Sequence, residues 1–314
     1  MSDYDVVIVG SGAGGGMATY ALTMRGVRVL LLEAGRDYDP ITETPMFQTN
    51  QQAPLRGERT PDKPFGYYDA TVDGGWEVPG EPYTVAEGSQ FKWWRSRMLG
   101  GRTNHWGRLS FRFGQDDFKG YTRDGIGVDW PIDYADLEPW YTRVETLIGV
   151  YGAAEGIRNS PDSPPGVLHE PPPPRAAELL LQKVAAKSTG MPIVPAHVAV
   201  LTRPINGRQA CFYATPCGRG CSIKANFQST TVLLPPAAAT GKLTVQTNAH
   251  VVEVTLRPDG RASGVRYIDK ATGAIVEVRA RSVMLAASAG ETARILLQST
   301  SKAHPNGLAN SSGH

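Results

Sequence analysis

The sequence predicts an α/β protein with a Rossmann-like domain and room for a second domain. Two observations support this: a strand–turn–helix–strand pattern over residues 5–35, and a second strand–turn–helix pattern over residues 282–298. Apolar runs separated by turn residues between 243 and 278 predict an antiparallel meander next to the second pattern. Strands that alternate with helices in this way are typical of the α/β class.

The first pattern opens the chain. Val6–Val9 is a run of apolar β-forming residues, and the amphipathic segment after it ends at Gly26. A second apolar run, Val27–Leu32, stops at the acidic Glu33. These runs predict a strand, a tight turn, a helix and a parallel strand.

The turn between the first strand and the helix has the spacing of a dinucleotide-binding loop. It reads G-x-G-x-x-G at Gly10, Gly12 and Gly15. The first glycine permits the turn, the second lets a pyrophosphate approach the backbone, and the third lets the helix pack on the strand. The helix N-terminus attracts phosphate, and Glu33 can bind ribose hydroxyls. NAD and FAD share this ADP moiety, whereas the acid at Glu33 disfavours NADP.

Composition limits the function classes. The chain has 314 residues, enough for two domains, with a net charge of +2 that gives no reason to expect nucleic acid or an anionic membrane as partner. Its apolar runs are far shorter than the roughly 18 residues of a membrane span. The first strand begins almost at Met1, so we expect no signal peptide and a cytoplasmic protein. The alternative is a periplasmic or membrane-associated location through a partner subunit.

Residues 40–113 contain an irregular stretch followed by a glycine pair. We expect an excursion with few regular elements up to residue 90. Gly100-Gly101 then precedes Thr103-Asn104-His105-Trp106. Paired glycines let the backbone contact a flat ligand, and the next three side chains supply polar atoms. The alternative is a Gly-Gly turn with a half-buried histidine and a tryptophan in the core.

Two helices are predicted in the middle of the chain. The first begins at Asp133, with Asp136 completing a partial capping box, and ends before Gly149. Its predicted apolar face is formed by Leu137, Trp140, Tyr141, Val144 and Ile148. A polyproline run at 171–174 precedes the second helix, over 175–187.

Three cysteines lie in a short glycine-containing loop. Cys211, Cys217 and Cys221 have C-x5-C-x3-C spacing. Three thiolates this close suit a three-iron cluster better than four-coordinate zinc. The alternatives are one disulfide with a spare thiol, or three reduced cysteines.

The last third of the chain is predicted to be strand-rich. Residues 243–256, 262–268 and 276–278 are predicted strands. A buried strand at 282–287 then leads through small residues into a helix at 291–298. This second strand–turn–helix unit is a weaker nucleotide-binding signal than the first.

As a set, these segments resemble the glucose–methanol–choline (GMC) family of FAD-dependent oxidoreductases. The matching segments are GSGAGGG with LLLEAG, LGGRTNHWG, LTVQTNAHVVEV, AASAGETARILLQS and PNGLANSSG. The resemblance implies that the nucleotide is FAD, that the loop from Leu99 to Gly107 covers its isoalloxazine ring, and that the backbone of Val251 binds adenine. The implied cofactor-binding residues are Gly10, Ser11, Gly12, Ala13, Gly15, Glu33, Ala34, Leu99, Gly100, Gly101, Thr103, Asn104, His105, Trp106, Val251 and Ala287.

Two details of the resemblance concern the flavin and its electron acceptor. Thr103 to Trp106 is similar to the segment of pyranose oxidases in which a histidine can bond covalently to the flavin, which makes His105 a candidate attachment site. The cysteine loop resembles that of the catalytic subunits of bacterial FAD-dependent glucose, sorbitol and gluconate dehydrogenases. That likeness implies a [3Fe-4S] cluster on Cys211, Cys217 and Cys221 and a cytochrome or quinone-type acceptor.

The resemblance also suggests a domain division. Residues 1–50, 91–125 and 225–314 form the expected FAD-binding domain, and 51–90 with 126–224 form excursions and part of a substrate domain. The family's catalytic histidine would lie beyond His314, so we expect a C-terminally truncated chain that holds FAD weakly at best and oxidises no alcohol alone. His169, His197, His250 and His304 match no family motif.

The predicted function is oxidation of a CH–OH group of a sugar or alcohol, with hydride transfer to flavin N5 and a non-NAD electron acceptor. The alternatives are a non-catalytic flavin-binding fragment and an NAD-dependent reductase that uses the single Rossmann unit. We find no hydrolase, metalloprotease or P-loop motif.

Overall fold

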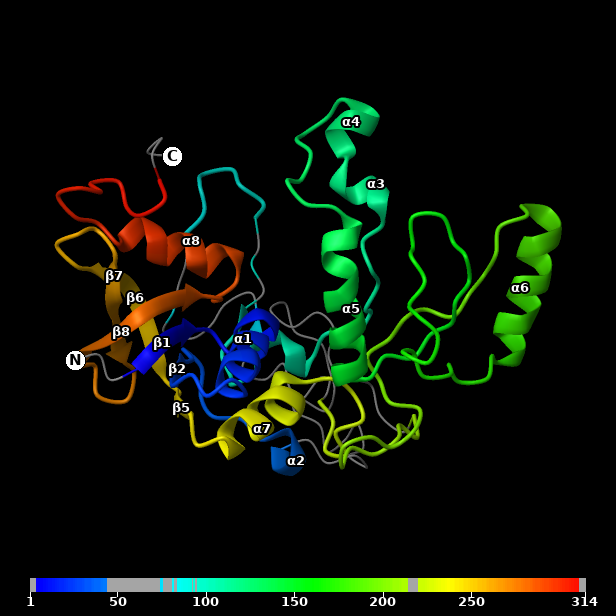
Figure 1. The fold of residues 1–314 in the computed structure, drawn as a ribbon, viewed down its shortest axis with the longest axis horizontal. Helices are drawn as coiled ribbons and strands as arrows, with labels where there is room; N and C mark the ends of the chain where they lie inside the picture. The colour runs from blue at the N-terminus through cyan, green and yellow to red at the C-terminus, as the bar shows by residue number, and fades with distance from the viewer. Residues whose placement is uncertain are drawn as a thin grey trace. The chain divides into compact units, whose positions relative to one another are not determined.

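The computed structural model describes residues 4–43, 74–75, 81, 84–91, 93, 95–213 and 220–310 (Figure 1). The chain divides into two compact units. Unit 1 comprises Met1–Trp106, Ala214–Ser222 and Gln228–His314, and unit 2 comprises Gly107–Tyr213 and Ile223–Phe227. The domain ranges expected from the sequence stay a prediction, and most of the predicted excursion up to residue 90 lies outside the described residues.

Unit 1 is built on a six-stranded sheet of order β5-β2-β1-β8-β7-β6. The first strand is parallel to β2 and β8, and β2 is parallel to β5, whereas β6, β7 and β8 form an antiparallel meander. The strands are β1 Tyr4–Val9, β2 Val29–Leu32, β5 Leu243–Gln246, β6 Ala249–Leu256, β7 Ala262–Asp269 and β8 Ile275–Leu285. A separate two-stranded ribbon pairs β3 (Gly74–Gly75) with β4 (Arg95–Ser96). The predicted α/β class, with its parallel strand–helix–strand unit and meander, is confirmed.

Strand β8 joins the two parts of the sheet. Its first half, Ile275 to Arg279, pairs with β7, and its second half, Ala280 to Leu285, pairs with β1. The sequence analysis predicted two strands here, at 276–278 and 282–287, and that division is wrong. The intervening residues include no glycine or proline to end a strand, so the extended backbone continues.

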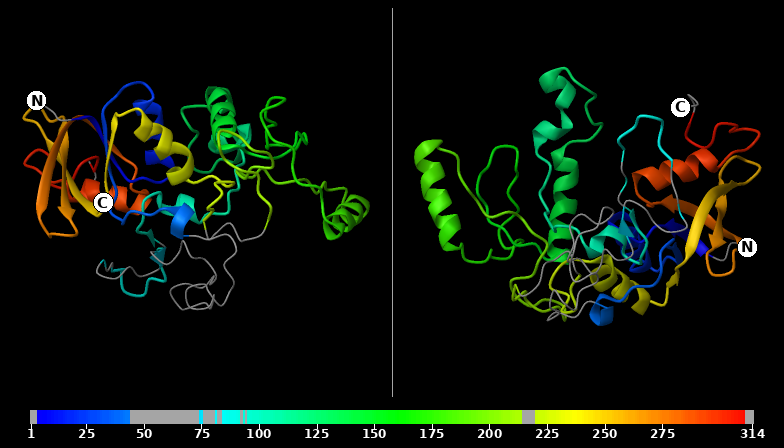
Figure 2. Two further views of the ribbon diagram at one scale, coloured as in Figure 1. Left: turned by 90° about the horizontal axis from the view of Figure 1, so that it is seen from below. Right: turned by 180° about the vertical axis from the view of Figure 1, so that it is seen from behind.

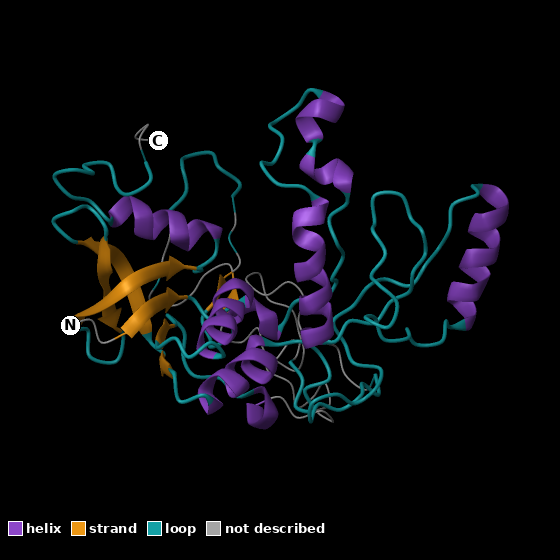
Figure 3. Ribbon diagram, viewed as in Figure 1, coloured by secondary structure: helices purple, strands orange, loops and turns teal. Residues whose placement is uncertain are grey.

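Helices cover both faces of the central strands β1 and β2 (Figure 3). Val7 and Val9 point to the face covered by helix α8 (Ala289–Gln298), which contributes Ile295 to the core. Ile8 points to the opposite face, which packs against helices α1 (Ala13–Thr23) and α7 (Leu234–Ala239). Strand β2 and the second half of β1 expose neither face to water, and this explains their continuous apolar runs. Strand β5 and the second half of β8 are partly exposed, so the predicted burial of the strand at 282–287 is wrong.

The remaining elements of unit 1 are short. Helix α2 spans Pro40–Glu43, a 3₁₀ turn spans Gly101–Asn104, and a π-helical turn at Ser229–Leu233 leads into α7. A cluster of Tyr38 and Met98 lies beside the Gly35 region, where the segment before the glycine pair passes close to the chain that follows β2.

Unit 2 is helical, with long connections (Figure 2). Its helices are α3 Gln115–Phe118, α4 Gly120–Asp124, α5 Tyr134–Ile148 and α6 Ala176–Ser188. The predicted capping box of α5 is confirmed: the Asp133 carboxylate accepts from the amides of Ala135 and Asp136, and the Asp136 carboxylate accepts from the Asp133 amide.

The predicted apolar face of α5 is partly wrong. Ile148 is buried as expected, but Trp140 is 55% exposed and stacks under the Arg143 guanidinium. Tyr134 and Glu145 are also buried, although neither belongs to the predicted face. Glu145 is buried because it pairs with a buried arginine. Within the described part of the chain, no helix is both long and apolar enough to cross a membrane.

Candidate functional site

The glycine-rich turn after β1 combines two tightly packed glycines with one open one. Gly10 has a positive φ of 95°, and a Cβ there would lie 2.5 Å from the carbonyl oxygen of Ala286. A Cβ at Gly15 would lie 1.8 Å from the Gly10 carbonyl oxygen. A Cβ at Gly12 would meet no atom within 4 Å. The fold therefore requires glycine at the first and third positions, whereas packing leaves the second open.

Helix α1 begins at this turn without a side-chain cap. Gly12 is its N-cap residue, no side chain caps the helix, and no acidic residue lies in its first turn. The first amides of a helix lack intrahelical acceptors and carry the positive end of the helix dipole. Ala13 and Gly14 are exposed at this end. The helix terminus therefore has the chemistry of an anion site.

Glu33, directly after β2, is buried against the same turn. Its Oε2 atom accepts from the Ser11 amide at 3.1 Å and from the Ser11 hydroxyl at 2.5 Å. Its Oε1 atom accepts from the Gly35 amide at 2.8 Å. Glu33 is only 7% exposed. These three bonds fix the orientation of the carboxylate beside the glycine turn.

The glycine pair at 100–101 lies next to the same turn. The Gly100 amide donates to the Ser11 hydroxyl at 2.8 Å, and a Cβ on Gly101 would lie 3.8 Å from the Gly12 Cα. Gly100 has a φ of 88°, which favours glycine. The structure thus brings the glycine turn and the glycine pair side by side.

Buried polar residues hold the segment after the glycine pair. The Thr103 hydroxyl donates to the Gly100 carbonyl and accepts from the Ser229 amide. The Asn104 amide group donates to the Leu99 carbonyl at 2.8 Å. These bonds shape the loop, and the predicted contact of Thr103 and Asn104 with a ligand stays a prediction.

His105 and Trp106 are half-buried at the end of this loop. The His105 Nε2 atom lies 2.5 Å from the Ser96 hydroxyl of β4. This bond orients the imidazole. Covalent attachment of flavin to His105 stays a prediction.

The remaining predicted cofactor residues also lie near the turn. Ala287 follows β8, and its Cα would be 3.0 Å from a Cβ on Gly10. The amide of Ala249, at the start of β6, donates to the Glu33 carbonyl. Val251, two residues along, is buried, and its carbonyl oxygen accepts from the Arg294 guanidinium at 2.7 Å. Ala34 lies between Glu33 and Gly35, and Leu99 packs with the core under α1.

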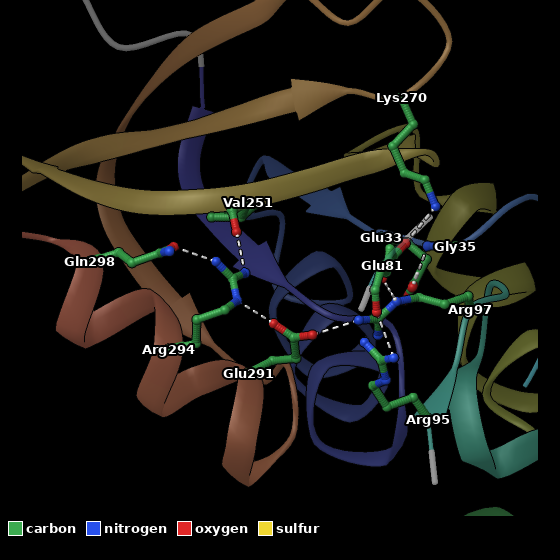
Figure 4. A network of polar contacts seen from close by, with 10 residues as sticks. All are labelled: Glu33, Gly35, Glu81, Arg95, Arg97, Val251, Lys270, Glu291, Arg294 and Gln298. Carbon is green, nitrogen blue, oxygen red and sulfur yellow. Dashed lines mark hydrogen bonds and ion pairs between the residues drawn. The ribbon is translucent and has the colours of Figure 1, made fainter. Parts of the chain in front are cut away.

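A network of charged residues links α8 to the segment before the glycine pair (Figure 4). Arg97 donates to Glu81 and to Glu291, each at 2.5 Å. Arg294 donates to Glu291 at 2.6 Å, and Lys270 donates to Glu81 at 2.7 Å. The sequence analysis missed this network. The only local signal was the i, i+3 spacing of Glu291 and Arg294, which is equally typical of a surface ion pair.

The network sets the charge state of Glu291. Burial alone raises the pKa of this carboxyl group, but the hydrogen bond from Arg294 and the charges of Arg97 and Arg294 outweigh burial and lower the pKa below 4.5. Because the pKa of Glu291 is lower in the folded than in the unfolded state, the ionised carboxylate stabilises the folded state at pH values above its unfolded pKa. That stabilisation is lost as the pH falls through the folded pKa.

We therefore expect Glu291→Gln to weaken the acid dependence of stability. At pH 7 the variant loses about 1–3 kcal/mol, because charged hydrogen bonds become neutral ones. Below pH 4.5 the gap between variant and wild type narrows. Urea unfolding between pH 7 and pH 3 measures both effects, with the exposed Glu87→Gln as control. A gap between Glu291→Gln and wild type that is independent of pH would contradict this expectation.

The predicted metal ligands are only partly described. Cys217 lies outside the described residues, and Cys211 and Cys221 belong to different units. No group of three or more His, Cys, Asp or Glu side chains suited to a metal occurs among the residues that the structure covers. The iron–sulfur cluster stays a prediction.

Relatives of this chain include oxidases and dehydrogenases. It is 33% identical to 2-methyl-1,2-propanediol dehydrogenase of Mycolicibacterium austroafricanum, over 98% of this chain and 53% of the relative. It is 30% identical to 6'''-hydroxyparomomycin C oxidase of Streptomyces lividus, over 98% and 52%. The large subunit of fructose dehydrogenase of Gluconobacter japonicus is 26% identical, over 98% and 56%. The chain thus spans about half the length of the curated relatives it matches.

A solved structure and a family model agree with these relatives. Pyridoxine 4-oxidase from Mesorbium loti shares the fold, with a TM-score of 0.56 and 18% identity over 95% of this chain and 52% of that one. The family model of GMC oxidoreductases matches residues 4–310. Because this match includes the glycine turn, Glu33, the glycine pair and α8, the chain belongs to the GMC oxidoreductase family, whose members are FAD-binding enzymes.

Proposed function

We propose that unit 1 is an FAD-binding domain, and that the family member it represents oxidises a CH–OH group of a sugar or alcohol. Gly12 and the N-terminus of α1 would hold the pyrophosphate, Glu33 the ribose, Val251 the adenine, and the loop from Leu99 to Trp106 the flavin ring. Bound FAD would accept a hydride from the substrate carbon.

The observation that carries this proposal is the open second glycine. Gly10 and Gly15 are explained by backbone packing, but no described atom lies within 4 Å of the position that a Cβ on Gly12 would take. Gly12 also adjoins an uncapped helix N-terminus and the glycine pair at 100–101. A negatively charged, extended ligand that approaches the backbone accounts for all three features together.

Glu33 has limited capacity for the ribose. A carboxylate has about four acceptor positions, and described residues occupy three of those on Glu33. One position on Oε1 remains, so we propose that Glu33 binds a single ribose hydroxyl. The sequence analysis expected more than one.

The substrate and the electron acceptor rest on the relatives. Their names describe oxidation of a diol, an aminoglycoside and a sugar, which supports an alcohol or sugar substrate. The resemblance implies a proton-accepting histidine beyond His314, and we propose that these residues alone oxidise no alcohol. Because one relative is a large subunit, we propose a non-NAD acceptor of cytochrome or quinone type on a partner subunit, served by a [3Fe-4S] cluster on the cysteine loop.

Gly12→Ala tests the FAD site without disturbing the fold. Its φ of −66° is accessible to alanine, and the added Cβ meets no described atom within 4 Å. We expect far-UV circular dichroism to be unchanged and the affinity for FAD, measured by flavin fluorescence, to fall at least about tenfold. Equal FAD affinity in variant and wild type would contradict the proposal. Tight NADH binding without FAD binding would select an NAD-dependent reductase instead.

A further inference from the structure

The Ser11 hydroxyl connects two parts of the candidate site that are far apart in sequence. It bonds Glu33, which follows β2, across 22 residues. It also bonds Gly100 across 89 residues. Gly100 lies in the loop from Leu99 to Trp106, which is proposed to hold the flavin ring and is called the ring-side loop below. Ser11 is fully buried. In a G-x-G-x-x-G turn the residue after the first glycine has no required identity, so the turn alone does not explain a serine here.

The direction of both bonds is fixed by chemistry. A carboxylate can only accept and an amide N–H can only donate, so the hydroxyl donates its single proton to Glu33 and accepts from Gly100. The carboxylate attracts the hydroxyl proton and makes the oxygen a better acceptor for the Gly100 amide. No apolar side chain, and no donor without an acceptor, could make the same pair of bonds.

From this arrangement we infer that Ser11 is a positioning residue for FAD, which sets the ring-side loop relative to the acid that binds the ribose. This inference rests on the proposed function. The Glu33 carboxylate is fixed at one end by the Gly35 amide and at the other by Ser11; Figure 4 shows the Gly35 end. Movement of Gly100 away from the turn would break the chain of bonds.

The consequence concerns ligands that span both ends of the site. FAD needs the ribose acid and the ring-side loop at a fixed separation, whereas ADP needs only the acid and the glycine turn. Removing the Ser11 hydroxyl therefore weakens FAD binding more than ADP binding. A purely structural role would weaken both equally through the folded population.

The first test is hydrogen exchange of the Gly100 amide in the ligand-free chain. Ser11→Ala removes the acceptor of this amide, and we expect exchange to accelerate at least about tenfold. Glu33→Gln keeps the serine but replaces its carboxylate partner, so we expect exchange of the Gly100 amide to accelerate less than in Ser11→Ala. The matched control is Thr19→Val, because Thr19 is also fully buried and its hydroxyl bonds no described residue. Unchanged exchange at Gly100 in Ser11→Ala would overturn the inference.

The second test compares titrations of Ser11→Ala, Thr19→Val and wild type with FAD and with ADP. We expect the FAD affinity of Ser11→Ala to fall about 10- to 100-fold and its ADP affinity to fall several-fold less, while Thr19→Val matches wild type. Equal losses for FAD and ADP would overturn the positioning role even if Gly100 exchanges faster. A wild type that binds neither ligand would overturn the proposed function and, with it, the role toward FAD. The exchange measurement would still report whether Ser11 holds the loop.

Discussion

Glu145→Ala is expected to lower the free energy of unfolding of unit 2 by about 3–5 kcal/mol. The Arg112 side chain is completely buried, and its guanidinium donates to both oxygens of Glu145, at 2.9 and 2.6 Å. Glu145 also accepts from the Ser163 hydroxyl. The Glu145 hydrogen bond and charge raise the pKa of Arg112 despite its burial. Arginine is too basic to lose its proton in proteins. The guanidinium therefore stays charged when its partner is removed, and a buried charge without a counter-ion is costly.

Chemical denaturation followed by circular dichroism measures this loss. Glu138→Ala is the matched control, because Glu138 is an exposed glutamate on the same helix, α5. We expect it to change stability by less than about 0.5 kcal/mol. The double variant Arg112→Met with Glu145→Ala removes the unpaired charge and should be more stable than Glu145→Ala alone. A double variant less stable than the single one would show that packing, rather than charge, dominates at this position.

Gly15→Ala is expected to destabilise unit 1 by about 3 kcal/mol or more. The new Cβ would lie 1.8 Å from the carbonyl oxygen of Gly10 and 3.3 Å from the Ala286 side chain. The first contact is with backbone, which cannot turn aside as a flexible side chain can. To relieve it, α1 has to move away from β1 and lose packing against the sheet.

Urea unfolding of Gly15→Ala beside Gly12→Ala separates steric cost from the loss of a glycine in general. Alanine at Gly12, the N-cap of α1, meets no described atom within 4 Å, so we expect that change to cost less than about 1 kcal/mol. Similar urea midpoints of unfolding for Gly15→Ala and Gly12→Ala would contradict the close packing of α1 and β1 at Gly15.

The sequence patterns predicted what depends on neighbouring residues. The helix cap at Asp133 follows from side chains that bond amides two and three residues away. Apolar runs such as Val6–Val9 indicated buried strands because both faces of the central parallel strands are covered. Where burial is decided by a distant partner, the patterns failed. Trp140 fits an apolar helix face but is exposed, and Glu145 looks like a surface residue but is buried with Arg112.

The sequence by itself determined the α/β class, the positions of the glycine turn and the glycine pair, and the family. These features follow from the order of residues along the chain. A single residue such as Gly10 indicates a tight turn, because its positive φ is a conformation that favours glycine. Only the tertiary structure decided how the site is held: Ser11 bonds Gly100 across 89 residues, and Arg97 bonds Glu291 across 194. Such contacts leave no periodic trace in the sequence, because the two partners meet only after the sheet has brought their strands and loops together.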